Sequence, residues 1–141
     1  MRWIHRFRDY FEPLTCISSG NSLVAMGSKY GKIYVYENVP ESNVVHITAI
    51  LAHHSSVVHS ILFHNNQIIS CSEDMTIGLV TLLSDGALVL SKVLQGHVSR
   101  VKTLAAQYDK IISGSDDRTV KLWTSNPGKY CLGRDPKRLS V

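Results

Sequence analysis

A histidine, a serine and an aspartate occur together twice in this chain, at the same spacing. The two sets lie 43 residues apart: His54, Ser70 and Asp74, then His97, Ser113 and Asp117. These are the residue types of a hydrolase triad, in which the histidine takes the proton of the serine and the aspartate orients the histidine. A hydrolase also needs an exposed nucleophile and an oxyanion site. The segment "SGS" that begins at Ser113 is not a nucleophile elbow.

Both sets belong to an internal repeat. Residues 51–80 align with residues 94–123 without a gap, and eleven of the thirty aligned positions are identical. A third, fainter copy runs over residues 14–36. Such self-similarity indicates one supersecondary unit that is used several times and stacked to bury a shared core. Because the repeat already explains the spacing, we interpret both sets as structural. We expect no catalytic residues and no enzyme activity.

The elements that position these residues are predicted to be short strands. Segments rich in β-branched residues alternate with turn-forming residues, which is typical of strands joined by tight turns. The predicted strands are 14–18, 22–28, 32–37 and 44–51, then 57–63, 67–72, 76–82 and 87–94, then 100–105, 110–115, 119–124 and a stunted 129–133. Four short strands per period predict an all-β fold, a partial β-propeller of about three four-stranded antiparallel blades.

The chain divides into three predicted regions. A basic and aromatic lead-in covers residues 1–12, where a short helix or an irregular segment is favoured over an outer strand. The repeat segment covers residues 13–127, and a basic tail covers residues 128–141. The boundaries of the repeat units are less sharp and fall at about 13–51, 52–94 and 95–133.

Positive charge gathers at the two ends of the chain. The formal net charge is +4, while residues 13–127 carry eight Lys or Arg and eight Asp or Glu. A nucleic-acid reader usually concentrates positive charge on its folded surface, which argues against nucleic acid as the main partner. The basic ends leave one alternative function, which is association with RNA or with an anionic membrane.

Composition sets further limits on the function. No apolar stretch approaches the ~20 residues that span a bilayer, and the charged N-terminus is unlike a secretory signal. The three cysteines, Cys16, Cys71 and Cys131, show no metal-type spacing, and the first two fall in predicted strands as small buried thiols. The other histidines considered as ligands are scattered: His46, His53, His59 and His64. We expect no metal site, no cofactor and a reducing compartment, cytoplasmic or nuclear.

The third unit resembles a WD repeat, the building block of WD-repeat β-propellers. Gly96–His97, Ser113–Asp117 and Trp123 stand at the spacing of that family, and the resemblance covers roughly residues 13–127. It implies that Asp117 contacts His97, that His97 reaches Ser113, and that Ser113 meets the N–H of Trp123. Each buried polar group would then have a partner, which is the condition for burying it.

The other two units depart from this pattern. The second unit has Val80 in place of the tryptophan, so its network is expected to lack one donor. The first unit has Met26, Tyr30 and Tyr36 at the serine, aspartate and tryptophan positions, and it has no matching histidine. Only the third network is therefore expected to be complete.

The resemblance also implies which loop residues lie on the narrower face of the propeller. We name this set the candidate protein-binding face: Lys29, Ser55, Val57, Glu73, Val98, Arg100 and Asp116. These residues carry both signs of charge. We therefore expect a polar peptide-binding patch, and not a phosphate or nucleic-acid site.

The function implied by the resemblance is a non-enzymatic scaffold for protein–protein interactions. An alternative is the substrate-recognition segment of a ubiquitin-ligase receptor of the F-box/WD-repeat type, although no F-box is visible. Three units are too few to close a ring of the usual ~4–8 blades, and an open arc would leave apolar faces bare. We expect a fragment of a larger propeller. Self-association and blades supplied by a partner are the alternatives.

Overall fold

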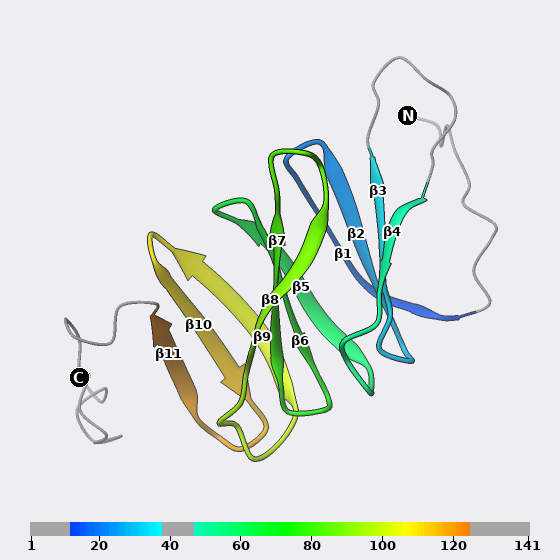
Figure 1. Ribbon diagram of the computed structural model, residues 1–141. Coiled ribbons are helices and arrows are strands. Elements are labelled where there is room, and N and C mark those ends of the chain that lie inside the picture. Colours follow the sequence, from blue (N-terminus) through cyan, green and yellow to red (C-terminus); the bar gives the residue numbers. More distant parts are fainter. Residues whose placement is uncertain (1–11, 38–46, 125–141) are drawn as a thin grey trace, which may run out of the picture.

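The computed structural model describes residues 12–37 and 47–124, and this part forms three antiparallel sheets side by side in chain order (Figure 1). The first sheet contains β1 (Leu14–Gly20), β2 (Leu23–Ser28), β3 (Ile33–Glu37) and β4 (Ile47–Leu51). The second contains β5 (Val58–His64), β6 (Gln67–Ser72), β7 (Ile77–Leu82) and β8 (Leu88–Leu94). The third contains β9 (Val101–Gln107), β10 (Lys110–Ser115) and β11 (Val120–Thr124).

The predicted all-β architecture is confirmed, and the strand limits agree closely with the sequence pattern. Strands β6 and β10 match their predicted ranges in full, while β1 and β9 each end two residues later than predicted. The predicted strand at 129–133 and residues 1–11 of the lead-in lie outside the described residues. Within the described ranges, no helix has the length and apolar character needed to cross a membrane.

Two-residue turns join the first two strands of the first and second sheets. Asn21 and Ser22 form one turn, Asn65 and Asn66 form the other, and all four residues have positive φ. Two successive residues with positive φ make a type I′ turn, whose twist matches that of the flanking strands. Asparagine tolerates this conformation better than other non-glycine residues do. Local sequence therefore fixes these two hairpins.

The same turns connect each sheet to the next. Asn21 Nδ2 donates a hydrogen bond to Asn66 Oδ1 at 3.2 Å. His64 Nε2 and Asn65 Nδ2 each lie 2.6 Å from the carbonyl oxygen of Tyr108, which follows β9. A carbonyl oxygen can only accept, so both nitrogens donate. These hydrogen bonds add to the apolar cores in holding neighbouring sheets together.

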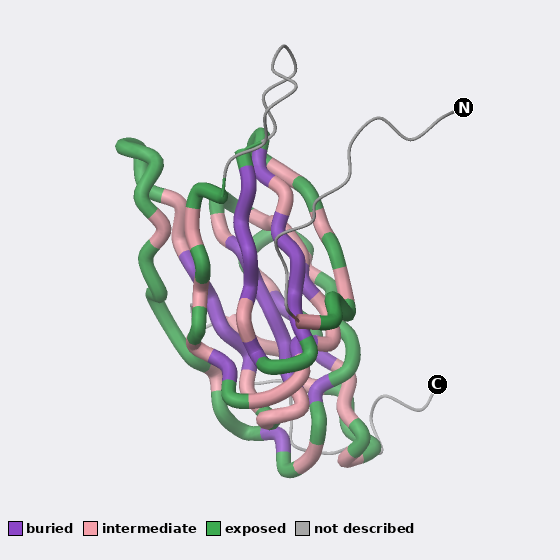
Figure 2. Tube along the Cα trace, turned by 90° about the vertical axis from the view of Figure 1, so that its right-hand side faces the viewer, coloured by how far each residue is buried: buried purple, intermediate pink, exposed green. Residues whose placement is uncertain are grey.

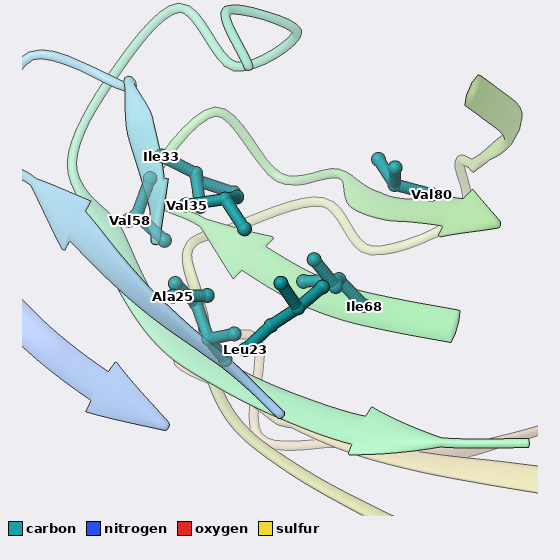
Figure 3. Close-up of a cluster of buried hydrophobic side chains, with 8 residues drawn as sticks. Leu23, Ala25, Ile33, Val35, Val58, Ile68 and Val80 are labelled. Atoms are coloured by element: carbon teal, nitrogen blue, oxygen red, sulfur yellow. The ribbon is translucent and has the colours of Figure 1, made fainter. Parts of the chain in front are cut away.

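Two apolar cores hold the sheets together. The first core lies between the first and second sheets (Figure 3) and contains Leu23, Ala25, Ile33, Val35, Val58, Ile61, Ile68 and Val80. The second lies between the second and third sheets and contains Ile69, Cys71, Ile77, Leu79, Val101 and Ile111. Alternate residues of a strand face opposite sides, so Ile68 and Ile69 enter different cores. The second sheet is consequently buried on both faces. Figure 2 shows the buried segments gathered in the middle of the molecule and the exposed segments along its edges and end turns.

The two outer sheets differ in their remaining faces. On the first sheet, Met26, Tyr34 and Tyr36 form a third buried cluster. On the third sheet, Ile112 is 40% exposed and Val120 is 63% exposed. The residues 43 positions earlier, Ile69 and Ile77, are only 0% and 1% exposed. Equivalent positions of the repeat are therefore buried in the second sheet and exposed in the third.

At the other end of the sheets, three equivalent turns join β2 to β3, β6 to β7 and β10 to β11. Each of these turns contains one residue with left-handed backbone. Gly31 has a φ of 89°, and its equivalents Met75 and Arg118 have φ values of 71° and 67°. Gly31 lies tightly against the neighbouring sheet, because a Cβ built on it would clash with the carbonyl oxygen of His54. Met75 and Arg118 show that other residues can adopt this left-handed backbone, so it is the lack of space beside His54 that requires glycine at position 31.

Variants of Gly31 and Gly86 separate the effect of backbone conformation from the effect of limited space. Gly31→Ala should destabilise the protein more than Gly86→Ala, since Gly86 has a φ of 85° but nothing within 4 Å of its added Cβ. The Gly86 variant should cost about 1 kcal/mol from backbone strain alone, and the Gly31 variant should add the clash with His54. Urea unfolding of both variants measures the difference. Equal losses would mean that the turn does not press on the second sheet.

Candidate functional site

The third unit contains a continuous hydrogen-bond network from loop to outer strand. His97, in the loop before β9, places Nδ1 2.7 Å from Asp117 Oδ2 and Nε2 2.7 Å from Ser113 Oγ. Trp123 on β11 donates its Nε1–H to Ser113 Oγ at 2.8 Å. Thr119 donates its hydroxyl to Asp117 Oδ1 at 2.6 Å. The structure thus brings together the four residues expected from the spacing.

The chemistry of the partners fixes the proton positions. A carboxylate only accepts, so His97 carries its proton on Nδ1 and its Nε2 accepts from the Ser113 hydroxyl. Burial alone would raise the pKa of Asp117, but hydrogen bonds from Thr119 and His97 outweigh burial and hold that pKa well below its usual range. Ser113 has no exposed surface. A substrate cannot reach this hydroxyl, so the arrangement fits a structural network and not a nucleophile.

The second unit repeats the first part of this geometry. His54 Nδ1 lies 3.0 Å from Asp74 Oδ2, and His54 Nε2 lies 2.9 Å from Ser70 Oγ. The expectation that this network lacks one donor is wrong. His53 Nε2 lies 3.0 Å from Ser70 Oγ. Because the Ser70 proton goes to His54, His53 must donate to Ser70, as Trp123 does in the third unit.

Side-chain volumes explain why two different residues can fill one position. His53 aligns with Gly96, and a Cβ built on Gly96 would lie 3.1 Å from the Trp123 ring. In the second unit, a Cβ on Gly78 would lie 2.2 Å from His53 Nε2. Glycine makes room for the tryptophan in one unit and for the histidine in the other. Sequence reasoning missed His53 because it sought a replacement for the tryptophan only at Val80.

The first unit replaces the polar network with apolar packing. Met26 and Tyr36, at the serine and tryptophan positions, are 5% and 3% exposed and share one cluster with Tyr34. Tyr30, at the aspartate position, is 62% exposed. The serine and tryptophan positions therefore hold buried Met26 and Tyr36, while the aspartate position holds an exposed tyrosine in place of a carboxylate.

The networks also hold the backbone of the candidate protein-binding face. Asp74 Oδ2 accepts the backbone N–H of Ser55 at 3.0 Å, and Asp117 Oδ2 accepts that of Val98 at 3.2 Å. Val98 is 82% exposed, so its side chain points to solvent while its backbone is fixed. A loop whose backbone is already held in this way loses less conformational freedom when a partner binds.

The remaining residues of this face repeat one backbone contact in all three sheets. The N–H groups of Lys29, Glu73 and Asp116 donate to the carbonyl oxygens of Pro13, Val57 and Arg100, at 2.8, 2.9 and 3.0 Å. Each contact ties the turn before the third strand to the start of the first strand. The seven residues are thus mounted on equivalent, hydrogen-bonded positions.

One ion pair crosses the face from sheet to sheet. Arg100 Nε lies 3.1 Å from Glu73 Oε1 of the second sheet and 4.0 Å from Asp116 Oδ2 of its own sheet. The Arg100 side chain remains 53% exposed. Such a pair contributes little to stability in water, so its charges stay available to a ligand.

The other predicted residues fall at separate places. Cys16 and Cys71 are free thiols, and burial raises the pKa of Cys71 to about 12, which makes it unreactive. His59 Nε2 is buried without a hydrogen-bond partner. His46 and Cys131 lie outside the described residues. In the ranges that the structure covers, no three His, Cys, Asp or Glu side chains are grouped to hold a metal ion.

His53 and His54 make the stability of the fold depend on pH. Burial, with the nearby charge of His54, lowers the pKa of His53 from 6.5 to about 4, and burial also lowers the pKa of His54. The fold thus favours neutral rings, while the unfolded chain binds protons below pH 6.5. The contribution of the neutral His53 ring to the free energy of unfolding should be greatest above pH 6.5 and should fall as the pH drops toward 4.

A single variant tests this dependence. His53→Gln keeps an N–H donor for Ser70 but cannot titrate, so its stability should fall less steeply between about pH 6.5 and 4. At about pH 7.5 the two proteins should unfold at similar urea concentrations, because His53 is then neutral in both states. Urea midpoints across this pH range give the comparison. Parallel curves for the two proteins would rule out His53 as the titrating group.

Known proteins share the sequence pattern that produces this geometry. The family model "WD domain, G-beta repeat" matches residues 45–79 and 88–124, half of the chain. The chain is 36% identical over 86 residues to cell division control protein 4 of Candida albicans, and 33% identical over 81 residues to human WD repeat-containing protein 37. These matches cover 60% and 49% of the chain but only 12% and 16% of the relatives.

A solved structure supports the same assignment. The crystal structure of the computationally designed Ika8 protein matches 79% of this chain and 33% of its own, with a TM-score of 0.66 and 27% sequence identity. Its similarity covers most of the described sheets, and the fold is a partial β-propeller. With two matched repeats, two buried His–Ser–Asp networks and three stacked sheets, the chain belongs to the WD40 repeat family.

Proposed function

We propose that this chain is a non-catalytic scaffold that binds other proteins through the candidate protein-binding face. WD-repeat domains commonly serve as protein interaction scaffolds and are generally non-catalytic. The observation that supports this role here is the repeated backbone contact under Lys29, Glu73 and Asp116. It holds side chains of both charges on a rigid frame, which suits a polar peptide better than a polyanion.

The ion pair on this face specifies its chemistry further. Arg100 and Glu73 come from neighbouring sheets and remain partly exposed. A partner that offers one acidic and one basic group can exchange this pair for two intermolecular pairs, which favours a peptide of mixed charge. The free thiols Cys16 and Cys71 support a reducing compartment, cytoplasm or nucleus, as the place where this binding occurs.

A charge reversal on the face tests the proposal. Glu73→Lys should weaken partner binding by at least about fivefold, because it removes an acidic contact and repels basic groups. Asp85→Lys is the matched control, since it makes the same charge change in the exposed turn between β7 and β8. Both variants and the natural chain are immobilised, and proteins captured from a cell extract are quantified by mass spectrometry.

The outcome distinguishes the classes of function. Proteins retained by the natural chain and by Asp85→Lys, but lost with Glu73→Lys, support a protein-binding face. An identical set with all three chains contradicts it. Salt-sensitive binding to RNA or to anionic vesicles that is lost on removal of residues 1–12 and 128–141 would favour the basic ends instead.

We further propose that a further blade covers the exposed apolar face of the third sheet. Ile112 and Val120 are exposed where the equivalent Ile69 and Ile77 are fully buried against a neighbouring sheet. Exposed apolar patches of this kind mark association surfaces. The chain spans less than a fifth of the relatives it matches, so the blade can belong to a longer polypeptide, a partner or a second copy.

Sizing the 141-residue chain tests this second step. Light scattering should show a mass above that of one chain, and replacing Ile112 and Val120 together by lysine should lower it, because charged side chains disfavour burial. The two side chains are already exposed, so the double variant should still fold. A natural chain that is a monodisperse, cooperatively melting monomer would contradict coverage of this face by a second copy.

A further inference from the structure

A pocket of about 350 Å³ lies between the second and third sheets and is partly open to solvent. It is lined by apolar side chains from both sheets: Ile69, Leu79, Ile111 and Trp123. Its mouth carries Lys92 from β8 and Asp109 from the turn between β9 and β10. Ligand pockets usually measure about 300–1000 Å³. This one, the inter-sheet pocket, lies at the lower end of that range and has room for a side chain of a partner.

The first core shows what fills such a space elsewhere in the repeat. Leu82 and Leu88, at the outer part of the second sheet, pack against the first core. Among the described residues, the second core has no counterpart of these two leucines, and the pocket opens beside Trp123. The positions that repeat them, 125 and 131, lie outside the described residues.

The wall of the pocket is rigid. Trp123 is held by its hydrogen bond to Ser113 at 2.8 Å, so its ring cannot turn away without leaving that serine without its donor. On the opposite wall, Ile69 and Leu79 are 0% and 9% exposed and belong to the second core. A preformed apolar slot beside an aromatic ring favours an aromatic side chain, which packs edge or face against the indole.

The charges at the mouth select what surrounds that side chain. Lys92 is exposed and forms no ion pair with any described residue. At the equivalent position the first sheet has Ala49, which packs against the first core. A lysine here favours an acidic residue next to the buried side chain. Asp109, across the mouth, favours a basic residue on the other side.

We propose that the inter-sheet pocket binds an extended peptide of a partner protein through one aromatic side chain flanked by a basic and an acidic residue. The site lies between the outer parts of the two sheets, away from the turns that carry the candidate protein-binding face. It rests on the proposed role of the chain as a protein-binding scaffold, and it adds a second contact of defined chemistry to that role.

Fluorescence of Trp123 gives a direct readout. The chain has two tryptophans, Trp3 and Trp123, so the full chain with Trp3→Phe reports on Trp123 alone. The probes are the blocked peptides GKFEG and GKAEG, titrated to about 1 mM, which reaches weak peptide affinities. GKFEG should change the emission in a saturable way. GKAEG should bind more than about tenfold more weakly, because it lacks the apolar side chain to bury.

A matched pair of protein variants locates the site. Lys92→Glu should weaken GKFEG binding by about two- to fivefold, the range expected for one exposed ion pair. Arg118→Glu makes the same charge change in the turn between β10 and β11 and should leave the affinity unchanged. Both side chains are exposed, so both variants should fold.

Three results would each overturn the proposal: no saturable change with GKFEG, equal affinity for GKAEG, or equal weakening by Lys92→Glu and Arg118→Glu. A chain that fills the pocket with its own residues gives the first of these results. Loss of captured proteins with Glu73→Lys is a separate measurement, so a failed pocket leaves the proposed scaffold function standing.

Discussion

One buried serine hydroxyl in each of two sheets is the contact on which their other polar contacts depend. A hydroxyl has one proton to donate and two lone pairs. In the third sheet, the Ser113 hydroxyl donates a hydrogen bond to His97 and accepts one from Trp123. Ser113 and Ser70 have no exposed surface, so a missing partner would cost about 1–3 kcal/mol. The loop, the middle strand, the turn and the outer strand must therefore be in place together, which makes each of these two sheets a cooperative unit.

The interior and the candidate protein-binding face share atoms. The oxygen of Asp117 that meets the His97 ring also accepts the backbone N–H of Val98, and Asp74 does the same for Ser55. Side chains on the face can change without loss of the fold, because the networks engage only the backbone of the face and the exposed Arg100–Glu73 ion pair adds little to stability. The same frame can therefore carry different recognition residues, and this explains why the face mixes charges and sizes while the network beneath it repeats.

Much of this arrangement could be predicted from the sequence, and the exceptions have a common cause. The alignment of two units located the strands, and the resemblance to a WD repeat implied the network of His97, Ser113 and Trp123. Both depend on spacing within one repeat. The alignment could not reveal His53, whose role depends on the space left by Gly78, nor the Arg100–Glu73 pair, whose members come from different units. The signal for His53 was present as a compensating change in volume: histidine with glycine in one unit, glycine with tryptophan in the other.

The burial of the second sheet on both faces has a consequence for dynamics. This sheet contributes to both apolar cores, whereas the third contributes to one of the two. In a linear array of repeats, stability is close to a sum over nearest neighbours. Local opening should then start at a peripheral repeat and stop at the central one, so that amide protons of β6 and β7 exchange by global unfolding while those of β9 to β11 exchange by partial detachment.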